Sequence, residues 1–417
     1  MVKKLIKEIP SGILLTWISG VLSILLLFVM IAKSPSQLRY DEPYHLDLAK
    51  SIESNGLRDG LLDPRNQSAA GPLYAGIHYV LKHITNQRAP DIRWVNAFLL
   101  VTAIVFLAFT KSQAGSETST ISCPALAVMG VPFLWPSAGM ALTEVPALTF
   151  FCAFLFIIRK LFSTKSSGSR FAETLSFAIA AGILLGLAIL GRQTYLVVIP
   201  VLFLLFLAGP VRPWLVGIIV AFTFLVSAWI FWIWGGLVPP SQAKVNEGLH
   251  WEHGLFSLAY VATGTAVLSP RWLLPKNRRL LFPIGLLGAC LAALSREYGE
   301  PPAKSLLIHF FGPDAGLAVG FLVFACMGAF GLYWLINTCM QLWQRREDSF
   351  QVFCGLILLA LVLAPVKISH LFSSRYVVGL LGVLLIVLQP SPSKFLAARI
   401  LVGSLVGAVT LYLYYYP

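Results

Sequence analysis

Charged residues are scarce in this sequence: Asp, Glu, Lys and Arg make up 12% of its 417 residues, against about a quarter in ordinary globular chains. The apolar residues (Ala, Val, Ile, Leu, Met, Phe, Trp, Tyr and Cys) make up 57%, and the mean hydropathy is +0.79. Soluble cores cannot hide such a surplus, so most of the chain should lie in lipid. Soluble multi-domain folds, disordered chains and coiled coils are therefore excluded.

Cysteine is also rare, and its positions carry no metal or disulfide pattern. No two of the six cysteines form a C-x-x-C pair, and all lie within or at the ends of apolar runs. Zinc sites and disulfide frameworks show characteristic spacings, so we interpret these residues as small core residues. They are Cys123, Cys152, Cys290, Cys326, Cys339 and Cys354.

Long runs without charge fill most of the sequence. A run of roughly 17 to 25 apolar residues crosses a bilayer as a helix, because lipid offers no partner to open backbone groups. We therefore predict an all-α polytopic membrane protein, a single transmembrane domain over residues 1–417. Its expected transmembrane helices, about 13, are 12–32, 94–110, 119–135, 144–158, 172–191, 195–209, 214–235, 255–269, 280–295, 315–337, 350–366, 377–389 and 400–416.

The distribution of Lys and Arg predicts the orientation. The net charge of +13 could suggest a nucleic-acid partner. With the N-terminus in the cytoplasm, however, 17 of the 31 Lys and Arg residues face the cytoplasm, whereas the short outer loops hold six and residues 33–93 hold eight. Short cytoplasmic loops are rich in these residues. We therefore expect a cytoplasmic N-terminus, an outer C-terminus and no nucleic-acid partner, in the ER membrane of a eukaryote or the plasma or inner membrane of a prokaryote.

Residues 33–93 are predicted to form a first outer loop that carries an acidic motif and an interfacial helix. In Gly71–Thr85 apolar residues recur at helical spacing, and Lys82 and His83 come late in the segment. Such a pattern suits a helix that lies in the membrane interface.

Two adjacent acids, Asp41 and Glu42, follow directly after the first predicted helix. Acids contribute little to topology, and a partly desolvated carboxylate has a raised pKa that suits a general base. The alternative is an Asp helix cap with Glu in the first turn of an exposed helix. Glu144 is similar: it precedes an uncharged run at the outer interface, and it is either functional or an acid favoured by the helix dipole.

Four potential cations are predicted to face the same side as these acids. Such a set could clamp a lipid-borne anion such as a phosphate. Alternatively, each side chain could anchor to lipid headgroups. The four are Arg192, Lys367, His370 and Arg375.

A second cluster of polar residues gives only a weak signal for a metal. Glu247, His250, Glu252 and His253 could place two or three ligands on one helical face. The spacing matches no established zinc motif, so we expect no metal.

With these residues in hand, the chain resembles the GT-C superfamily of polytopic glycosyltransferases, and more narrowly the dolichyl-phosphate-glucose alpha-1,2-glucosyltransferase family. The short matching pieces occur in the family's order over residues 40–376. They are Asp41-Glu42-Pro43-Tyr44-His45, Leu62-Asp63-Pro64, Gly71-Pro72-Leu73-Tyr74, Thr143-Glu144, Arg192-Gln193-Thr194, Leu249-His250 and Arg375-Tyr376. The family's late Asp-Asn-Arg-His-Tyr type segment has no counterpart in residues 296–314.

The resemblance implies a GT-C-like fold and transfer of a hexose, with glucose suspected, from a polyprenyl-phosphate or dolichyl-phosphate sugar to a glycan or lipid-linked acceptor, with inversion. Asp41 would be the base, and Glu42 and Glu144 would bind acceptor hydroxyls or orient Asp41. Arg192, Lys367, His370 and Arg375 would bind the donor phosphate, without a cofactor or divalent metal. The further residues expected to bind substrate are His45, Asp63, Tyr74, Gln193, His250 and Tyr376.

A transporter or flippase for a lipid-linked or anionic substrate is the competing interpretation. Its substrate path would place charges at the centres of helices. The ionisable residues here lie mostly at predicted helix ends, which favours an enzyme.

Overall fold

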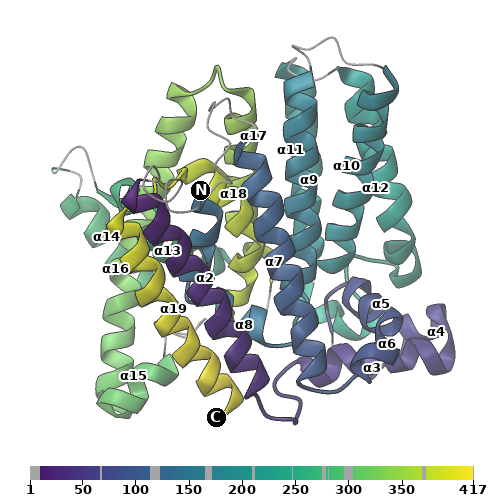
Figure 1. Cartoon of the computed structure of the whole chain (residues 1–417), viewed down its shortest axis with the longest axis horizontal. Helices are drawn as coiled ribbons and strands as arrows, with labels where there is room; N and C mark the ends of the chain where they lie inside the picture. Colours follow the sequence, from purple (N-terminus) through teal and green to yellow (C-terminus); the bar gives the residue numbers. More distant parts are fainter. Residues whose placement is uncertain are drawn as a thin grey trace, which may run out of the picture.

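A computed structural model shows the chain as a bundle of helices (Figure 1). It describes residues 10–65, 68–112, 123–164, 171–208, 212–246, 248–274, 279, 281–294, 304–368 and 372–416. No strand occurs among these residues, which agrees with the all-α prediction.

Eight of the described helices are long and apolar enough to cross a membrane. This supports a multi-pass integral membrane protein, as the uncharged runs predict. The eight are α2 Ser11–Ala32, α7 Asp91–Ser112, α9 Glu144–Thr164, α10 Phe171–Gly191, α12 Pro213–Trp234, α16 Pro313–Gln344, α17 Ser349–Leu363 with η6 Ala364–Lys367, and α19 Lys394–Tyr415.

Shorter apolar elements lie between these spans, where further crossings are predicted. The predicted total of 13 spans is not settled by length and composition, and it stays a prediction. The shorter elements are η2 Gln193–Val197 with α11 Val198–Ala208, α13 Trp251–Leu268, α14 Leu281–Leu294, and η7 Ser374–Leu380 with α18 Leu381–Leu388. Three more short elements connect them: η3 Pro240–Asn246, η4 Pro270–Leu273 and α15 Lys304–Phe311.

The predicted helix at 119–135 is wrong for the part that the structure describes. A 3₁₀ segment, η1 Cys123–Gly130, is followed by the start of a short helix, α8 Leu134–Gly139. Pro124, Pro132 and Pro136 lie in this stretch, and each lacks the N–H that a continuous helix needs. Apolar composition alone did not reveal the break.

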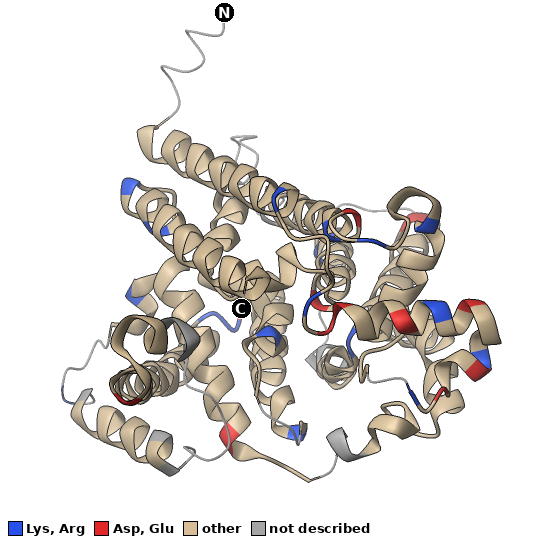
Figure 2. Cartoon of the chain, turned by 90° about the horizontal axis from the view of Figure 1, so that it is seen from below, with Lys and Arg blue, Asp and Glu red and all other residues tan. Residues whose placement is uncertain are grey.

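Four short helices gather at the end of the bundle where α2 ends and α7 and α9 begin (Figure 1). Figure 2, seen from that end, shows acidic and basic residues interspersed along them, whereas the long helices are mostly uncharged. The helices are α3 Glu42–Asn55, α4 Leu57–Leu61, α5 Leu73–Val80 and α6 Lys82–Thr85. We call this end of the molecule the site end.

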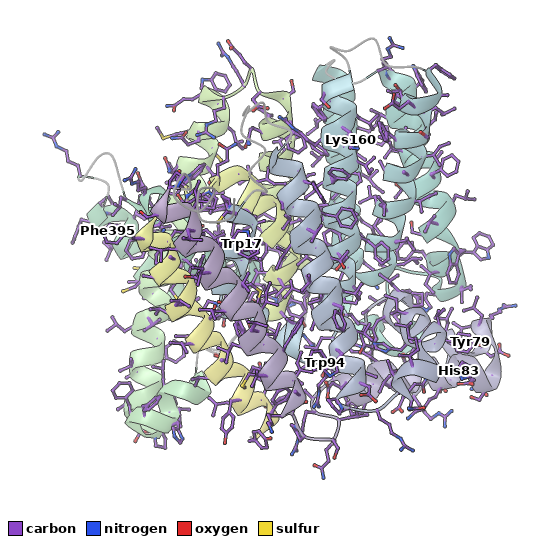
Figure 3. All side chains as sticks on the ribbon, in the orientation of Figure 1. Trp17, Tyr79, His83, Trp94, Lys160 and Phe395 are labelled. Carbon is purple, nitrogen blue, oxygen red and sulfur yellow. The ribbon has the colours of Figure 1, made fainter. Side chains whose placement is uncertain are left out.

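Within the predicted interfacial helix Gly71–Thr85 the structure has two short helices, α5 and α6, and their place in a membrane interface stays a prediction. Val80 and Ile84 expose 75% and 76% of their surface, as expected for side chains that face a membrane interface. Tyr79 and His83 lie at the site end, whereas Lys160 of α9 lies at the opposite end (Figure 3). The side of the membrane that each end faces stays a prediction.

Candidate active site

A cavity of about 900 Å³ opens at the site end of the bundle. The polar residues of its lining, which we call the polar wall, come from the start of α3, the start of α9, the end of α10 and η7. The lining also includes apolar residues, among them Leu196, Val197, Leu237, Val238 and Leu363. A cavity lined by both charged and apolar residues suits an amphipathic ligand that carries a polar head on an apolar chain.

Two acids and two arginines form a chain of ion pairs across the polar wall. Asp41 pairs with Arg375, and Glu144 pairs with Arg192. Arg375 joins the two pairs, because its Nε lies 3.7 Å from Glu144 Oε1. Residues 41, 144, 192 and 375 are far apart in sequence, so the fold assembles this group from four separate segments.

Local structure explains why these side chains reach the cavity. Asp41 is the N-cap residue of α3, and Glu144 is the first residue of α9. Arg192 follows the last residue of α10 in an extended conformation, with φ −147° and ψ 115°. Each lies where a helix starts or stops, so the side chain leaves the apolar bundle at its end.

Tyr376 completes the polar wall. The guanidinium carbons of Arg192 and Arg375 lie 5.8 Å and 5.7 Å from its ring centroid. An aromatic face attracts cations at this range. The ring therefore helps to keep two like charges near each other.

The pKa of Asp41 differs from the sequence expectation. Burial raises it, as predicted, but Arg375 together with smaller effects of His45 and Arg192 lowers it, and the net pKa lies below the usual value. Asp41 is therefore ionised at neutral pH. Burial and the nearby Arg375 lower the pKa of Arg192 to about 10, so this residue still carries its charge.

Four further predicted residues line the same cavity. His45 Nδ1 lies 3.1 Å from Ser68 Oγ, and burial together with Arg375 lowers its pKa to about 3, which keeps the ring neutral. Gln193 donates to the Ala69 carbonyl at 2.8 Å. Lys367 donates to the Gly248 carbonyl at 3.3 Å. Tyr376 is the fourth.

Glu42 does not line the cavity. It is 0% exposed and accepts two hydrogen bonds from the guanidinium of Arg93, at 2.8 and 2.7 Å. Contact with acceptor hydroxyls is therefore excluded by geometry in this arrangement, because the carboxylate is enclosed by protein. Its other predicted role, orientation of the neighbouring Asp41, stays a prediction.

Three other predicted substrate-binding residues also lie outside the cavity wall. Asp63 pairs with Arg65 at 2.8 Å and accepts from Ser51, so it organises the outer segment. Tyr74 is buried beside His45 and His78. His250 Nδ1 lies 3.0 Å from Glu252 Oε1, although its neighbour Leu249 does line the cavity.

Two predicted residues fall outside the part of the chain that the structure describes. They are His370, expected to bind phosphate, and Glu247, a member of the weak metal cluster. Among the described residues, no group of three His, Cys, Asp or Glu side chains is placed to hold a metal ion.

Sequence reasoning did not single out Arg93, although it is fully buried beside Glu42. A signal was available. Arg93 lies in the first turn of α7, where a cation opposes the helix dipole, so a specific partner is needed to hold it there. The cavity residue Ser68 was missed as well, because a short polar side chain in a loop gives no pattern. Tyr44, which also lines the cavity, belongs to the acidic motif but was given no role.

No family model matches the sequence, and no curated protein matches it. Among solved structures, ArnT from Cupriavidus metallidurans bound to undecaprenyl phosphate is 12% identical with a TM-score of 0.43, over 92% of this chain and 77% of that one. The oligosaccharyltransferase of Archaeoglobus fulgidus is 15% identical with a TM-score of 0.41, over 89% and 56%.

This chain thus spans little more than half of the length of that oligosaccharyltransferase. Similarity at these scores says nothing about substrate or activity. The predicted glucosyltransferase family has no matching model and stays a prediction. The functional proposal below therefore rests on the geometry of the cavity.

Proposed function

We propose that this protein is an integral-membrane glycosyltransferase of the GT-C type. It transfers a hexose, with glucose as the first candidate, from a polyprenyl or dolichyl phosphate to a hydroxyl of a glycan or lipid-linked acceptor on the non-cytoplasmic side. One observation carries the proposal: Asp41, Glu144, Arg192 and Arg375 meet in one cavity that is otherwise lined largely by apolar residues.

Each kind of lining residue matches one part of such a donor. The apolar residues, of which Leu237, Leu249 and Leu363 are exposed, suit an isoprenoid chain that arrives from the bilayer. The two guanidinium groups suit a phosphate, because arginine presents paired N–H donors to its oxygens. Lys367 adds a third cation at the rim.

The chemistry follows from the same placement. The acceptor oxygen attacks the anomeric carbon, the bond from that carbon to the phosphate oxygen breaks, and the hydroxyl proton passes to Asp41. Phosphate is a weak base, so it needs charge stabilisation by Arg192 and Arg375 rather than protonation. Direct displacement inverts the anomeric configuration. Because the arginines supply the positive charge, the proposed chemistry uses no divalent metal.

A phosphate between Arg192 and Arg375 competes with Asp41 and Glu144 for the same guanidinium groups. When the donor binds, Arg375 also interacts with the phosphate and therefore lowers the pKa of Asp41 less than before. Asp41 then becomes a stronger base at the moment when a proton has to be removed. Glu144 keeps the arginines in place and accepts hydrogen bonds from hydroxyl groups of the acceptor.

The test is transfer by the purified full-length chain in detergent. Undecaprenyl- and dolichyl-phosphate hexoses, with glucose first, are offered together with extracted lipid-linked glycans as acceptors, and products are read by mass spectrometry. A sugar-bearing product supports the proposal. If no donor is consumed, while a labelled lipid phosphate crosses the bilayer in proteoliposomes, the transporter interpretation replaces it.

A further inference from the structure

Arg93 has no contact with the cavity, yet it is the most completely bonded cation among the described residues. All five of its N–H donors are used: two bind Glu42, one binds Ser34 Oγ at 2.8 Å, and two bind the carbonyls of Pro35 and Gln37 at 2.6 and 2.9 Å. The guanidinium also lies 4.9 Å from the Tyr415 ring centroid. The loop that leads into Asp41 is therefore fastened to α7.

Glu42 extends this network to a second segment. Its Oε1 accepts from the backbone N–H of Ala141 at 2.9 Å, and its Oε2 accepts from the backbone N–H of Arg39 at 2.8 Å. Ala141 lies three residues before Glu144. The Arg93–Glu42 pair thus connects the backbone beside one cavity acid with the backbone just before the other.

Asn96 lies three residues after Arg93, on the same face of α7. Its amide donates to the carbonyls of Met140 and Leu142, at 2.8 Å each. The segment before Glu144 is therefore held by α7 on both sides of Ala141. Arg93, Glu42 and Asn96 form one group, which we call the α7 clamp.

A gain in stability does not by itself explain why these charged residues are buried. Removing two charges from water costs free energy that their attraction often only offsets, and apolar residues of similar volume are frequently as stable. A buried, fully bonded ion pair does fix geometry, however. The geometry fixed here is the placement of the two segments that carry Asp41 and Glu144.

We propose that Arg93 is a positioning residue: through Glu42 and the Ala141 backbone it sets the separation of the Asp41 and Glu144 carboxylates across the cavity. The inference rests on the proposed function, since separation matters only if both acids act on one substrate. A displacement of about 1 Å in such a group can lower a rate about 100-fold. The α7 clamp makes no bond to Arg192 or Arg375, so it affects turnover more than phosphate binding.

The main test uses the double variant Glu42→Gln/Arg93→Gln, which leaves no lone buried charge. The full-length chain in nanodiscs is assayed for turnover of the polyprenyl-phosphate hexose that the wild type uses, and for affinity toward undecaprenyl phosphate. Hydrogen exchange is followed in residues 38–46 and 139–145. Lys82→Gln is the matched control, because it removes another ion pair of the outer segment, Lys82–Glu53 at 2.7 Å.

We expect turnover to fall about 10- to 100-fold, lipid-phosphate affinity to change far less than turnover, and exchange to rise in both segments. The control should match the wild type. Unchanged turnover, or affinity that falls as far as turnover, would overturn the inference. If the wild type consumes no donor, the proposed function fails separately, and exchange alone decides: faster exchange in both segments supports the α7 clamp, and unchanged exchange refutes it.

A second variant covers the case in which the double variant does not fold. Asn96→Leu removes the bonds to Met140 and Leu142 without leaving a buried charge. Exchange should rise in residues 139–145 and stay unchanged in residues 38–46, with a smaller loss of turnover. Exchange that rises equally in both segments, or in neither, would contradict the assignment.

Discussion

Asp41 is held ionised by Arg375, the same cation that we assign to the donor phosphate. In the variant Asp41→Asn the side chain keeps its size but cannot accept the proton. We expect transfer to fall by about 10² to 10⁴, because the acceptor hydroxyl loses its base. Affinity for undecaprenyl phosphate, measured by thermal shift, should be retained or increased, since Arg375 is released from its carboxylate partner.

The control for this variant is Arg375→Gln, which should lose donor affinity but keep the base. Donor affinity falls first, and the loss of turnover is partly restored at high donor concentration. If Asp41→Asn turns over at a near-normal rate, another group is the base, and the proposed proton transfer to Asp41 is wrong.

The lowered pKa of Asp41 predicts how activity depends on pH. Burial raises this pKa, but Arg375 together with smaller effects of His45 and Arg192 lowers it by more in total, so in the free wild-type enzyme the base stays ionised above the ordinary Asp pKa of about 3.9. The acid limb of kcat/KM, which reports groups of the free enzyme, should therefore lie below this value. In Arg375→Gln the burial remains and the counter-charge is gone, so the limb should move to higher pH.

Profiles of kcat/KM between about pH 4 and about pH 8 check this expectation. The residual activity of Arg375→Gln must be measured with the same donor as the wild type. A limb that stays in place in the variant, or moves to lower pH, would mean that Asp41 is not the titrating base.

At the scale of elements, the site depends on a close approach between the end of α10 and the start of α5. A Cβ at Gly71 would overlap the carbonyl oxygen of Leu190, two residues before Arg192, whereas a Cβ at Gly76 in α5 meets nothing within 4 Å. Gly71→Ala should therefore lower stability by about 1 to 3 kcal/mol and reduce turnover by displacing Arg192.

Gly76→Ala is the matched control for Gly71→Ala. It should stabilise α5 by about 0.5 to 1 kcal/mol, because alanine loses less backbone entropy than glycine in a helix. Thermal unfolding and donor turnover of both variants give the measurement. Equal effects of the two substitutions would show that the contact between Gly71 and Leu190 does not position the site.

Much of the element pattern could be predicted from uncharged runs, and the exceptions have physical causes. The predicted span 172–191 agrees with α10, and 12–32 agrees with α2. The run 119–135 failed because two prolines, Pro124 and Pro132, interrupt it. A run of apolar residues indicates burial in lipid, but it does not reveal whether the backbone can hydrogen-bond continuously.

The site was predictable in kind and less so in detail. Eight of the thirteen predicted residues line the cavity. Charged side chains at the ends of apolar helices avoid both the lipid and the apolar interior, so they gather in the polar part of such a cavity. Glu42 and Asp41 are neighbours in sequence, but the first turn of a helix points successive side chains in different directions. Which of the two faces the cavity depends on Arg93, a partner 51 residues away. The pKa of Asp41 likewise depends on Arg375, which only the fold brings near.

At the scale of the whole molecule, the candidate site and the outer helices share one end of the bundle (Figure 1). Lys160 lies at the other end, while His83 and Tyr79 lie with the site (Figure 3). The excess of Lys and Arg in the predicted cytoplasmic loops predicts that the site end lies on the non-cytoplasmic side. This orientation decides on which side the donor's sugar has to be presented.

Single-cysteine variants can test that orientation. In a chain with its six cysteines replaced, His83→Cys should react with a membrane-impermeant maleimide added to sealed vesicles of native orientation, because α6 lies at the site end. Lys160→Cys should react only after the membrane is permeabilised. The reverse pattern would place Asp41 and Arg375 on the cytoplasmic side, where a polyprenyl-phosphate sugar would have to be presented before any transfer across the membrane. The ion-pair chain would keep its chemistry in that case, but the proposed acceptor on the non-cytoplasmic side would be wrong.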